Sequence, residues 1–469
     1  MNYKSFLKEV LTIKFDKAFG LDIGDRSVEI IELDKIFRFS LVTYGRVELP
    51  EGVVENGRIL DQNILAEKLK KLLKEVKPRR VSTNKVIISL PESQVYIQCF
   101  EVEASLKRAA LSVAVLDKVR LSSPLNIDKT YWDFTENTLA DKTKKLIVFI
   151  SVPKDIANSY VKFCNSIGLE VVSLCIESLS LARTLLKSSD KQSLIIDIGA
   201  GSTNLSFFDS NDKINMSMTI PVAGDQITTA IEDKLKIDKP EAEALKIKYG
   251  FKEVAENTFL PAILPLLESI LKETGDAIKY YEETYKQKLD NIYLVGGTAL
   301  APGLIERVRD GLKREVQIGT GNYDINLSFL SSKTNPYPLY ANVIGLGMLG
   351  ASGEFRDINL IKKLPASEVN SVNRLNLFNM GYLSRVNTVR TVLNNKYVLI
   401  MMVILIGVIF AILLQQTKSF GPSDAPVVTP KRVNTIKPKT PLSFSSTTKL
   451  MSTTTRLLPI VPTTTIKKK

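Results

Sequence analysis

The sequence predicts an α/β protein with two related halves, and three short stretches carry that prediction. Residues 193–209, SLIIDIGAGSTNLSFFD, read as a buried strand, a turn of small residues and a second apolar strand, which is the pattern of a hairpin. Residues 18–33, AFGLDIGDRSVEIIEL, repeat this pattern earlier in the chain. Residues 291–304, NIYLVGGTALAPGL, are a third buried strand that ends in a glycine pair. The repeated hairpin indicates a duplicated domain.

Both hairpin turns have the composition of a phosphate-binding site. Glycine lets the backbone approach an anion closely, and successive N–H groups in a turn can hold phosphate oxygens. Asp22 and Asp197 stand just before the turns, where a carboxylate can hold the water shell of Mg²⁺. The alternative is two ordinary hairpins with capping aspartates. The glycine pair favours a nucleotide, because a flat base or ribose can lie against it.

These three stretches, in this order, resemble the phosphate-1, phosphate-2 and adenosine motifs of the actin and sugar-kinase superfamily of ATPases. Residues 220–250, IPVAGDQITTAIEDKLKIDKPEAEALKIKYG, narrow the resemblance to the type IV pilus assembly protein PilM family, which is related to the cell-division protein FtsA. The resemblance covers residues 15–350. It implies a two-lobed, actin-like (RNase H-like) ATPase fold that opens and closes around ATP and Mg²⁺.

The resemblance also implies which residues hold the nucleotide. They are Asp22, Gly24, Asp25, Arg26, Ser27, Asp197, Gly199, Gly201, Ser202, Thr203, Gly224, Asp225, Glu243, Lys246, Gly296 and Gly297. Of these, Asp22 and Asp197 would hold Mg²⁺ through water, and Glu243 and Lys246 would flank the ribose and base. On spacing alone, Glu243 and Lys246 are better explained as an exposed i, i+3 ion pair that stabilises a helix by about 0.2–0.5 kcal/mol.

Two residues depart from the pattern of the family. Glu29 stands where related chains commonly carry a lysine, and Ala223 replaces a glycine before Gly224. A carboxylate cannot contact the β-phosphate, so either Arg26 takes the place of the lysine or phosphate binding is weaker. Phosphoryl transfer to water also needs a group that positions the water, and the sequence identifies none. We therefore expect ATP binding with slow or no hydrolysis, and we assign no catalytic residue.

Composition excludes several other functions. The chain contains no histidine, which removes Ser–His and Cys–His nucleophiles and every histidine-ligated metal site. Its three cysteines form no CxxC motif, and reduced, buried thiols are the expectation. The net charge is +13, but much of the excess lies in the tail, residues 415–469, so it is weak evidence for nucleic-acid binding.

Residues 397–414, YVLIMMVILIGVIFAILL, form an apolar run without a charge. At 1.5 Å per residue it would span about 27 Å, enough to cross the hydrocarbon core of a bilayer. The charges that flank it are nearly balanced, so they do not decide its direction. The first residues lack the continuous apolar core of a signal peptide, so we expect the ATPase body on the cytoplasmic side of the inner membrane and the tail outside.

A short segment before this run has a resemblance of its own. Ile358, Asn359, Leu360, Ile361 and Pro365 resemble the cytoplasmic segment of PilN that docks on PilM. The apolar members stand in an otherwise polar linker and need burial, so we expect the segment to dock in extended form in a groove of the ATPase body, near its insertion. The resemblance implies PilN- and PilO-like membrane partners, with the groove filled by the chain's own segment or a neighbour's, and a possible homo-oligomer.

The predicted organisation comprises a first actin-like lobe over residues 16–92, a small α+β insertion of the 1C type over 93–168, a connecting strand and helix over 169–192, a second lobe over 193–334, a return helix over 335–352, a PilN-like linker over 353–396, a transmembrane helix over 397–414 and a disordered Thr/Ser/Pro/Lys-rich tail over 415–469.

We expect an ATP-binding inner-membrane scaffold of a type IV pilus machine. The alternatives are the actin-like L component of type II secretion and a membrane-tethered, FtsA-like division filament. A small-molecule kinase is least favoured, since the insertion and the span have no use in one.

Overall fold

The computed structural model describes residues 17–35, 38–123, 126–139, 142–186, 191–321, 325, 337–353 and 358–363. All of them belong to the first of two compact units, residues 1–384. The predicted transmembrane helix over 397–414 and the tail over 415–469 lie outside the described residues. Within the described ranges, no helix combines the length and the apolar character that a bilayer crossing requires.

The first large sheet contains the first hairpin. Its strands are β1 (Phe19–Ile23), β2 (Ser27–Lys35), β3 (Phe39–Glu48), β6 (Lys77–Pro78), β7 (Lys85–Leu90) and β11 (Glu170–Ile176), in the order β11-β7-β1-β2-β3-β6. Strands β1, β2 and β3 are antiparallel neighbours, whereas β7 runs parallel to β1, and β11 runs parallel to β7. Parallel neighbours need a crossover connection between them, and the chain leaves the sheet after β7 to build one.

The second large sheet repeats this arrangement. Its strands are β12 (Ser193–Ile198), β13 (Thr203–Phe208), β14 (Ile214–Ile220), β15 (Asn291–Val295) and β16 (Gln317–Ile318), in the order β14-β13-β12-β15-β16. Again three antiparallel strands are followed by two parallel ones. The predicted α/β fold with two related halves is therefore confirmed.

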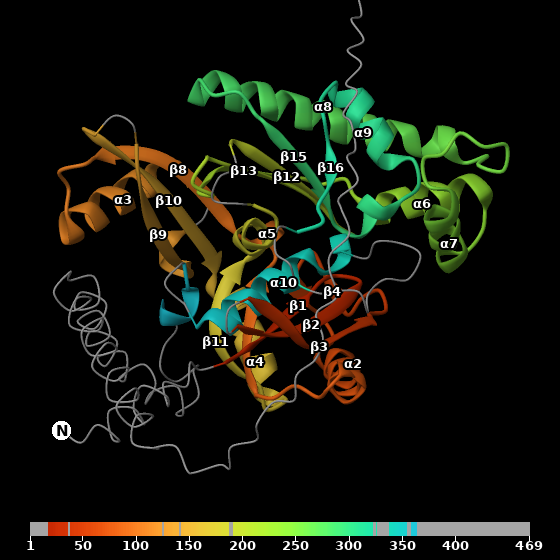
Figure 1. The fold of residues 1–469 in the computed structure, drawn as a ribbon, viewed down its shortest axis with the longest axis horizontal. Coiled ribbons are helices and arrows are strands. Elements are labelled where there is room, and N and C mark those ends of the chain that lie inside the picture. The colour runs from red at the N-terminus through yellow and green to blue at the C-terminus, as the bar shows by residue number, and fades with distance from the viewer. Residues whose placement is uncertain are drawn as a thin grey trace, which may run out of the picture. The chain divides into compact units, whose positions relative to one another are not determined.

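Two helices lie between the large sheets, α5 (Glu177–Leu185) and α10 (Tyr337–Ser352) (Figure 1). Hydroxyl groups hold them together: Ser180 Oγ donates to the carbonyl of Asn342, and Thr184 Oγ1 donates to that of Ala341, both at 2.7 Å. A Cβ built on Gly345 would lie 2.0 Å from the carbonyl oxygen of Ser180. The two helices therefore approach each other closely at this glycine.

We expect Gly345→Ala to destabilise the protein by about 1–3 kcal/mol, because the added methyl group overpacks a buried helix contact. Gly275→Ala is the matched control: Gly275 lies within helix α8 (Leu260–Tyr285), and a Cβ there meets no atom within 4 Å. That change should stabilise by about 0.5–1 kcal/mol through helix propensity alone. Urea unfolding of both variants measures the contrast, and a Gly345→Ala protein as stable as its parent would contradict it.

A third, smaller sheet stands apart from the two large ones. It consists of β8 (Tyr96–Glu103), β9 (Thr130–Thr138) and β10 (Lys144–Pro153) in the order β8-β10-β9, with helix α3 (Arg108–Ser122). These elements have a core of their own, in which Phe100 and Phe149 pack with apolar residues of α3. Trp132 stacks on Phe134 and Phe149 and so packs within this unit. The next helix, α4 (Lys154–Ser166), contacts both this sheet and β11.

The remaining helices cover the outer sides of the large sheets. Helix α2 (Gln62–Glu75) packs on the first sheet, and its first turn is capped by the Asp61 carboxylate, which accepts from two main-chain N–H groups. In Figure 1, α8 and α9 (Leu304–Leu312) lie over the second sheet, with α6 (Gly224–Leu235) and α7 (Lys239–Tyr249) at one end. The short elements are β4 (Val54–Glu55), β5 (Arg58–Ile59), η1 (Glu92–Gln94), η2 (Ile127–Lys129), η3 (Gly297–Leu300) and η5 (Leu360–Lys363).

Candidate functional site

The two hairpin turns meet between the lobes. A Cβ built on Gly201 would lie 2.7 Å from Oδ2 of Asp25, so glycine at this position lets the second turn approach the first without displacing that carboxylate. The Asp25 carboxylate accepts from the main-chain N–H groups of Asn56 and Gly57, each at 3.0 Å. These bonds hold the first turn against the loop between β4 and β5.

Both turns expose main-chain donors. Each is closed by one bond, from the Gly24 N–H to the Ser27 carbonyl at 2.9 Å and from the Gly199 N–H to the Ser202 carbonyl at 3.1 Å. Within the described part of the chain, the N–H groups in the turns that donate to no protein acceptor are those of Asp25, Arg26, Ala200, Gly201 and Ser202. Clustered N–H groups of this kind form anion-binding concavities.

The start of α6 and the glycine pair complete the site around the second turn. The N–H groups of Gly224 and Asp225 donate to the carbonyls of Gly199 and Ala200, at 3.1 and 2.9 Å. Gly296 has a φ of 89°, and a Cβ built on it would lie 2.4 Å from Oδ1 of Asp197. Three separate sequence motifs thus converge on one place. Gly297 is turned away from them toward Leu339 of α10, which a Cβ would meet at 3.5 Å.

Glu243 and Lys246 form the i, i+3 ion pair that their spacing predicts, but the lysine is buried. The Lys246 ammonium lies 2.7 Å from Oε2 of Glu243, and it donates to the Gly224 carbonyl at 3.0 Å and to Thr228 Oγ1 at 2.9 Å. Lys246 is only 7% exposed, whereas the Glu243 side chain is 43% exposed. The expectation of an exposed pair therefore fails for Lys246, because α7 packs on α6 and brings this lysine under the first turn of α6.

Two predicted phosphate ligands have other partners. Thr203 is fully buried at the start of β13, and its hydroxyl donates to the Val222 carbonyl at 2.7 Å. Ser27 begins β2, and its hydroxyl interacts with the Glu29 carboxylate. Neither side chain is directed at the space between the turns. Both hydroxyls therefore have partners other than the predicted phosphate.

Ion pairs join the two lobes at the mouth of the site. Arg26 of the first turn binds Asp225 of α6 with two bonds, Nη2 to Oδ2 at 2.6 Å and Nε to Oδ1 at 3.3 Å. Lys239 of α7 binds Glu51 at 2.7 Å, and Glu51 also lies 3.6 Å from Arg26. In this structure, two of the predicted nucleotide ligands therefore bind each other, and the cleft is closed.

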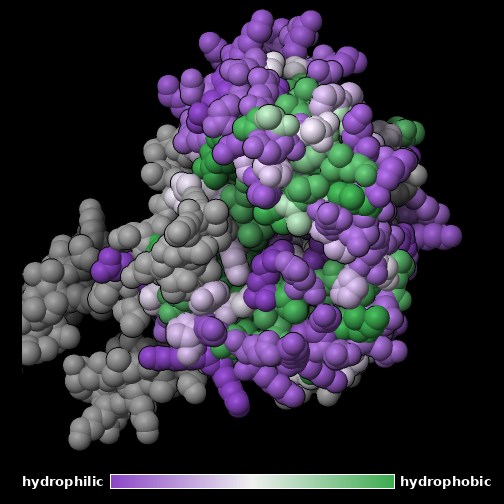
Figure 2. All heavy atoms as spheres, turned by 90° about the vertical axis from the view of Figure 1, so that its right-hand side faces the viewer, coloured by the Kyte–Doolittle hydropathy of each residue, from purple (hydrophilic) through white to green (hydrophobic). Residues whose placement is uncertain are grey.

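Beside these ion pairs lies an open cavity of ≈ 510 Å³. Charged and polar side chains of the first lobe and of α6 line most of it, and apolar residues of α8 complete it. Its lining includes Asp25, Arg26, Glu51, Asn56, Gly201, Asp225, Asp233, Lys239, Ala262, Pro265 and Leu266. Figure 2 views this side of the molecule, where hydrophobic side chains gather in the middle of the face and hydrophilic ones surround them.

Glu29, which departs from the family pattern, has a compensating charge. It lies opposite Arg46 in the sheet, and Arg46 Nε binds its Oε1 at 2.8 Å. On its other side it is paired with Asp22 of β1. Burial raises the pKa of Glu29 to about 7, and the neighbouring Asp22 charge adds to this shift. With Glu29 bound to Arg46, Arg26 is the cation of the first turn.

Carboxyl groups gather behind the turns. Burial raises the pKa of Asp22 to about 6 and that of Asp197 to about 7, and for Asp197 the charges of Asp22 and Glu92 contribute as well. Burial, followed by the charges of Asp22, Asp197 and Glu92, holds the pKa of Glu177 well above its usual value. The Glu92 N–H donates to Glu177 Oε2 at 3.2 Å. Sequence reasoning did not assign Glu177 to the site, although an acid placed directly after a buried strand was a usable signal.

This donor set fits a hydrated cation. Carboxylate oxygens are the hard ligands that Mg²⁺ accepts, and Mg²⁺ usually keeps several of its waters. Among the described residues, no three acidic or cysteine side chains come together with the geometry of direct metal ligands. Contact with Mg²⁺ through water at Asp22 and Asp197 stays a prediction.

We expect the nucleotide-free protein to become less stable as the pH rises from about 5.5 to 7.5. In the folded protein, the pKa values of Asp22, Asp197 and Glu29 lie above their ordinary values of 3.8 to 4.5. The folded state therefore holds more protons than the unfolded state in this pH window. Stability then falls by up to about 1.4 kcal/mol per pH unit for each such proton, and the loss is complete above pH 7. Thermal melting at the two pH values measures it; equal stability, or a gain toward pH 7.5, would contradict it.

The predicted partner segment also docks on the body. The amide of Asn359 accepts from the Leu174 N–H at 3.0 Å and donates to the Val172 carbonyl at 3.4 Å, both in β11. The prediction of an extended segment is wrong from Leu360 onward: residues Leu360–Lys363 form a 3₁₀ turn, in which the Ile361 N–H donates to Asn359 Oδ1 at 3.2 Å. Pro365 lies outside the described residues.

Two related lobes with hairpin turns that face each other, joined by two crossing helices, define an actin-like ATPase fold. The chain belongs to the type IV pilus assembly protein PilM family, whose model matches residues 20–342. The family resemblance drawn from the sequence is therefore confirmed. A solved PilM–PilN type IV pilus biogenesis complex shares the fold, with a TM-score of 0.61 and 21% identity over 71% of this chain and 98% of that one.

Curated relatives include cell-division proteins. FtsA of Streptococcus pneumoniae is 23% identical over 390 residues, which cover 73% of this chain and 81% of FtsA. FtsA of Bacillus subtilis is 22% identical over 351 residues, 65% of this chain and 78% of its own length. These similarities fit a position on the FtsA/PilM branch of actin-like proteins.

Proposed function

We propose that this protein binds Mg-ATP between its two hairpin turns and acts as a membrane-attached scaffold in type IV pilus assembly. The observation that carries the nucleotide site is the pair of facing turns whose main-chain N–H groups have no protein acceptor among the described residues. Two such turns, one from each lobe, can hold the phosphates of one nucleotide from both sides. Membership of the PilM family supports the role in pilus assembly.

Each group has a distinct part in binding. The N–H groups of both turns hold phosphate oxygens, and Arg26 turns from Asp225 toward them when phosphate enters. Asp22 and Asp197 accept hydrogen bonds from the water shell of Mg²⁺, whose charge offsets that of the phosphates. Lys246 and Glu243 flank the ribose and base, and Gly296 lines the adenosine.

Slow or absent hydrolysis is part of this proposal, because the sequence identifies no group that positions the attacking water. Burial, followed by the charges of Asp22, Asp197 and Glu92, raises the pKa of Glu177 well above its usual value, which favours its protonated form. A protonated carboxyl group cannot accept a proton from water. We therefore propose that nucleotide occupancy, rather than rapid turnover, sets the state of the scaffold.

The proposed membrane anchor is the apolar run over residues 397–414. It places the body at the cytoplasmic face of the inner membrane and the tail outside. A charge at the centre of such a run costs about 2.5–3.5 kcal/mol on insertion scales. Carbonate washing of membranes should leave the full chain in the pellet, and recovery in the soluble fraction would contradict the anchor.

The proposed partners are PilN- and PilO-like membrane proteins. The solved structure with the same fold is a complex of PilM with PilN, and the segment Ile358–Asn359–Leu360–Ile361 of this chain resembles the docking segment of PilN. We propose that this chain carries that segment itself, followed by its own membrane span. Similarity to FtsA supports one alternative, a membrane-tethered division filament. Sedimentation with Mg-ATP separates the two, because only a filament protein pellets.

The nucleotide site is tested by thermal melting of the full chain in detergent. At Mg-ATP concentrations about 100-fold above Kd, binding should stabilise the protein by about 2.7 kcal/mol. ATP with a chelator should stabilise it less, since the charge of Mg²⁺ is then missing. If millimolar Mg-ATP does not change the melting temperature, this result contradicts the proposed site.

A further inference from the structure

Residues 358–363 lie between two sheet edges. Strand β11 is the outer strand of the first sheet and β9 is the outer strand of the third, and the segment contacts both. An outer strand presents unpaired main-chain groups that can bind another chain. This place is therefore built to receive a short piece of polypeptide.

A single side chain satisfies the edge of β11. The Asn359 amide accepts from the N–H of Leu174 and donates to the carbonyl of Val172, which are the two bonds that a neighbouring strand would make. The pairing of β11 with β7 is irregular at Val172, between Val171 and Ser173. Asparagine matches this site because it carries a donor and an acceptor on one short, planar group.

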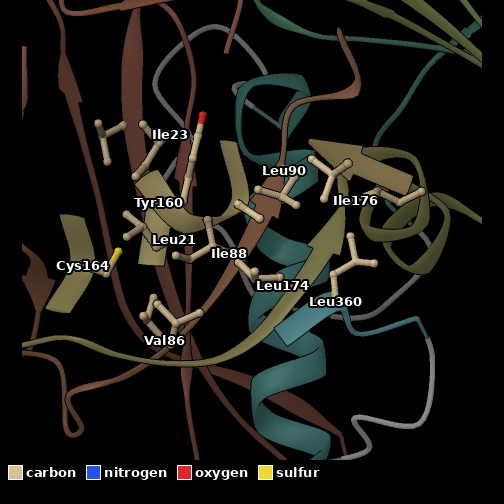
Figure 3. Close-up of a cluster of buried hydrophobic side chains, with 14 of the residues drawn as sticks. Leu21, Ile23, Val86, Ile88, Leu90, Tyr160, Cys164, Leu174, Ile176 and Leu360 are labelled. Atoms are coloured by element: carbon tan, nitrogen blue, oxygen red, sulfur yellow. The ribbon is translucent and has the colours of Figure 1, made fainter. Parts of the chain in front are cut away.

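The neighbours of Asn359 enter the main hydrophobic core. Leu360 is fully buried, and Ile358 and Ile361 are 4% and 7% exposed. All three belong to the same apolar cluster as Leu174 and Ile176 of β11, and Figure 3 shows Leu360 beside these two side chains. The pattern apolar-Asn-apolar-apolar therefore has a specific receptor, in which each member contacts the body.

The connection to this receptor is short. Only residues 354–357 separate Gly353, at the end of α10, from Ile358. Five residue steps reach at most about 18 Å. A tether this short gives an effective concentration in the millimolar range, so the segment of the same chain outcompetes a similar segment at micromolar concentration.

We propose that the site between β11 and β9 is a receptor for segments of the pattern Ile-Asn-Leu-Ile, and that residues 358–361 occupy it in cis and exclude such a segment from another chain. This inference rests on the proposed function only for the identity of that other chain, a PilN-like partner. The partner segment binds when the internal one leaves. The internal segment thus sets a threshold for partner binding, and the short tether disfavours exchange between neighbouring copies.

The test measures binding of a fluorescein-labelled peptide, RDINLIKKLP, to the full chain in detergent by anisotropy. With an effective concentration in the millimolar range and an intrinsic Kd of about 10 μM, the cis segment lowers the apparent affinity about 100-fold. The double variant Asn359→Ala/Leu360→Ala should bind the peptide at least about ten-fold more tightly than the unmodified chain. The peptide with its asparagine replaced by alanine should bind that variant more weakly.

Leu121→Ala is the matched control, because Leu121 is 91% exposed on α3. It should bind the peptide as the unmodified chain does. Equal affinity of the unmodified chain and the double variant, or no binding to either at millimolar peptide, would overturn the proposal. If the double variant fails to fold, hydrogen exchange on the unmodified chain decides: saturating peptide should speed exchange at Ile361 while Leu174 stays protected, and no change at Ile361 would overturn it. A persistent Mg-ATP shift in the same samples shows that only this inference has failed.

Discussion

Asp197→Asn is expected to abolish the stabilisation of the full chain by Mg-ATP. Asp197 is the penultimate residue of β12, close to the second turn, and a neutral amide in its place cannot hold the water shell of Mg²⁺ as a carboxylate does. The gain of about 2.7 kcal/mol at 100 times Kd should fall to within error of zero. Without nucleotide the variant should be as stable as its parent or more so, because one buried charge next to Asp22 and Glu92 has been removed.

Melting curves with and without Mg-ATP measure both effects. Asp276→Asn serves as the control, since Asp276 lies on the exposed side of α8 and should leave the Mg-ATP shift unchanged. If Mg-ATP shifts the melting curve of Asp197→Asn as much as that of its parent, the Asp197 carboxylate does not contribute to nucleotide binding. If Asp197→Asn melts at a much lower temperature than its parent without nucleotide, this result contradicts the inferred repulsion between the buried acids.

Leu360→Ala is expected to release the docked segment from the body. Truncation of a fully buried leucine costs about 2–5 kcal/mol, and Leu360 lies in the apolar cluster that holds this segment on the body. The loss should appear as local opening, with exchange of the Ile361 amide faster by at least about ten-fold and little change in the main sheets. Leu121→Ala should change stability by less than about 0.5 kcal/mol.

Hydrogen exchange with mass-spectrometric detection separates local from global effects. Rapid exchange at Ile361 in the unmodified chain would show that the segment is a linker rather than part of the core. A uniform increase across all strands of Leu360→Ala would show instead that the segment supports the entire fold.

The sequence predicted the local elements of the site because their signals are local. Each hairpin was visible as two apolar runs joined by a turn of small residues. Burial from distant elements could not be predicted this way. Thr203 looked like a turn residue, but β14 and the carbonyl of Val222 enclose it. The spacing of Glu243 and Lys246 is typical of an exposed helix pair, and the packing of α7 against α6 buries Lys246.

The charge partners across the cleft could not be predicted from the sequence either. Arg26 and Asp225 lie in different lobes, and nothing in either motif indicates that they bind each other at 2.6 Å in the closed state. Arg46, which compensates Glu29, becomes its neighbour only through the register of β2 and β3. The docked segment was predicted from its apolar residues in a polar context, but its 3₁₀ turn was not, since four residues carry too weak a periodicity.

The most direct test of the central claim is a structure of the protein with Mg²⁺ and a non-hydrolysable ATP analogue. The β- and γ-phosphates should lie between the turns at Gly24–Ser27 and Gly199–Ser202, with Arg26 released from Asp225 and the base beside Gly296. An analogue bound only in the outer cavity, or no bound analogue at millimolar concentration, would contradict nucleotide binding at the paired turns.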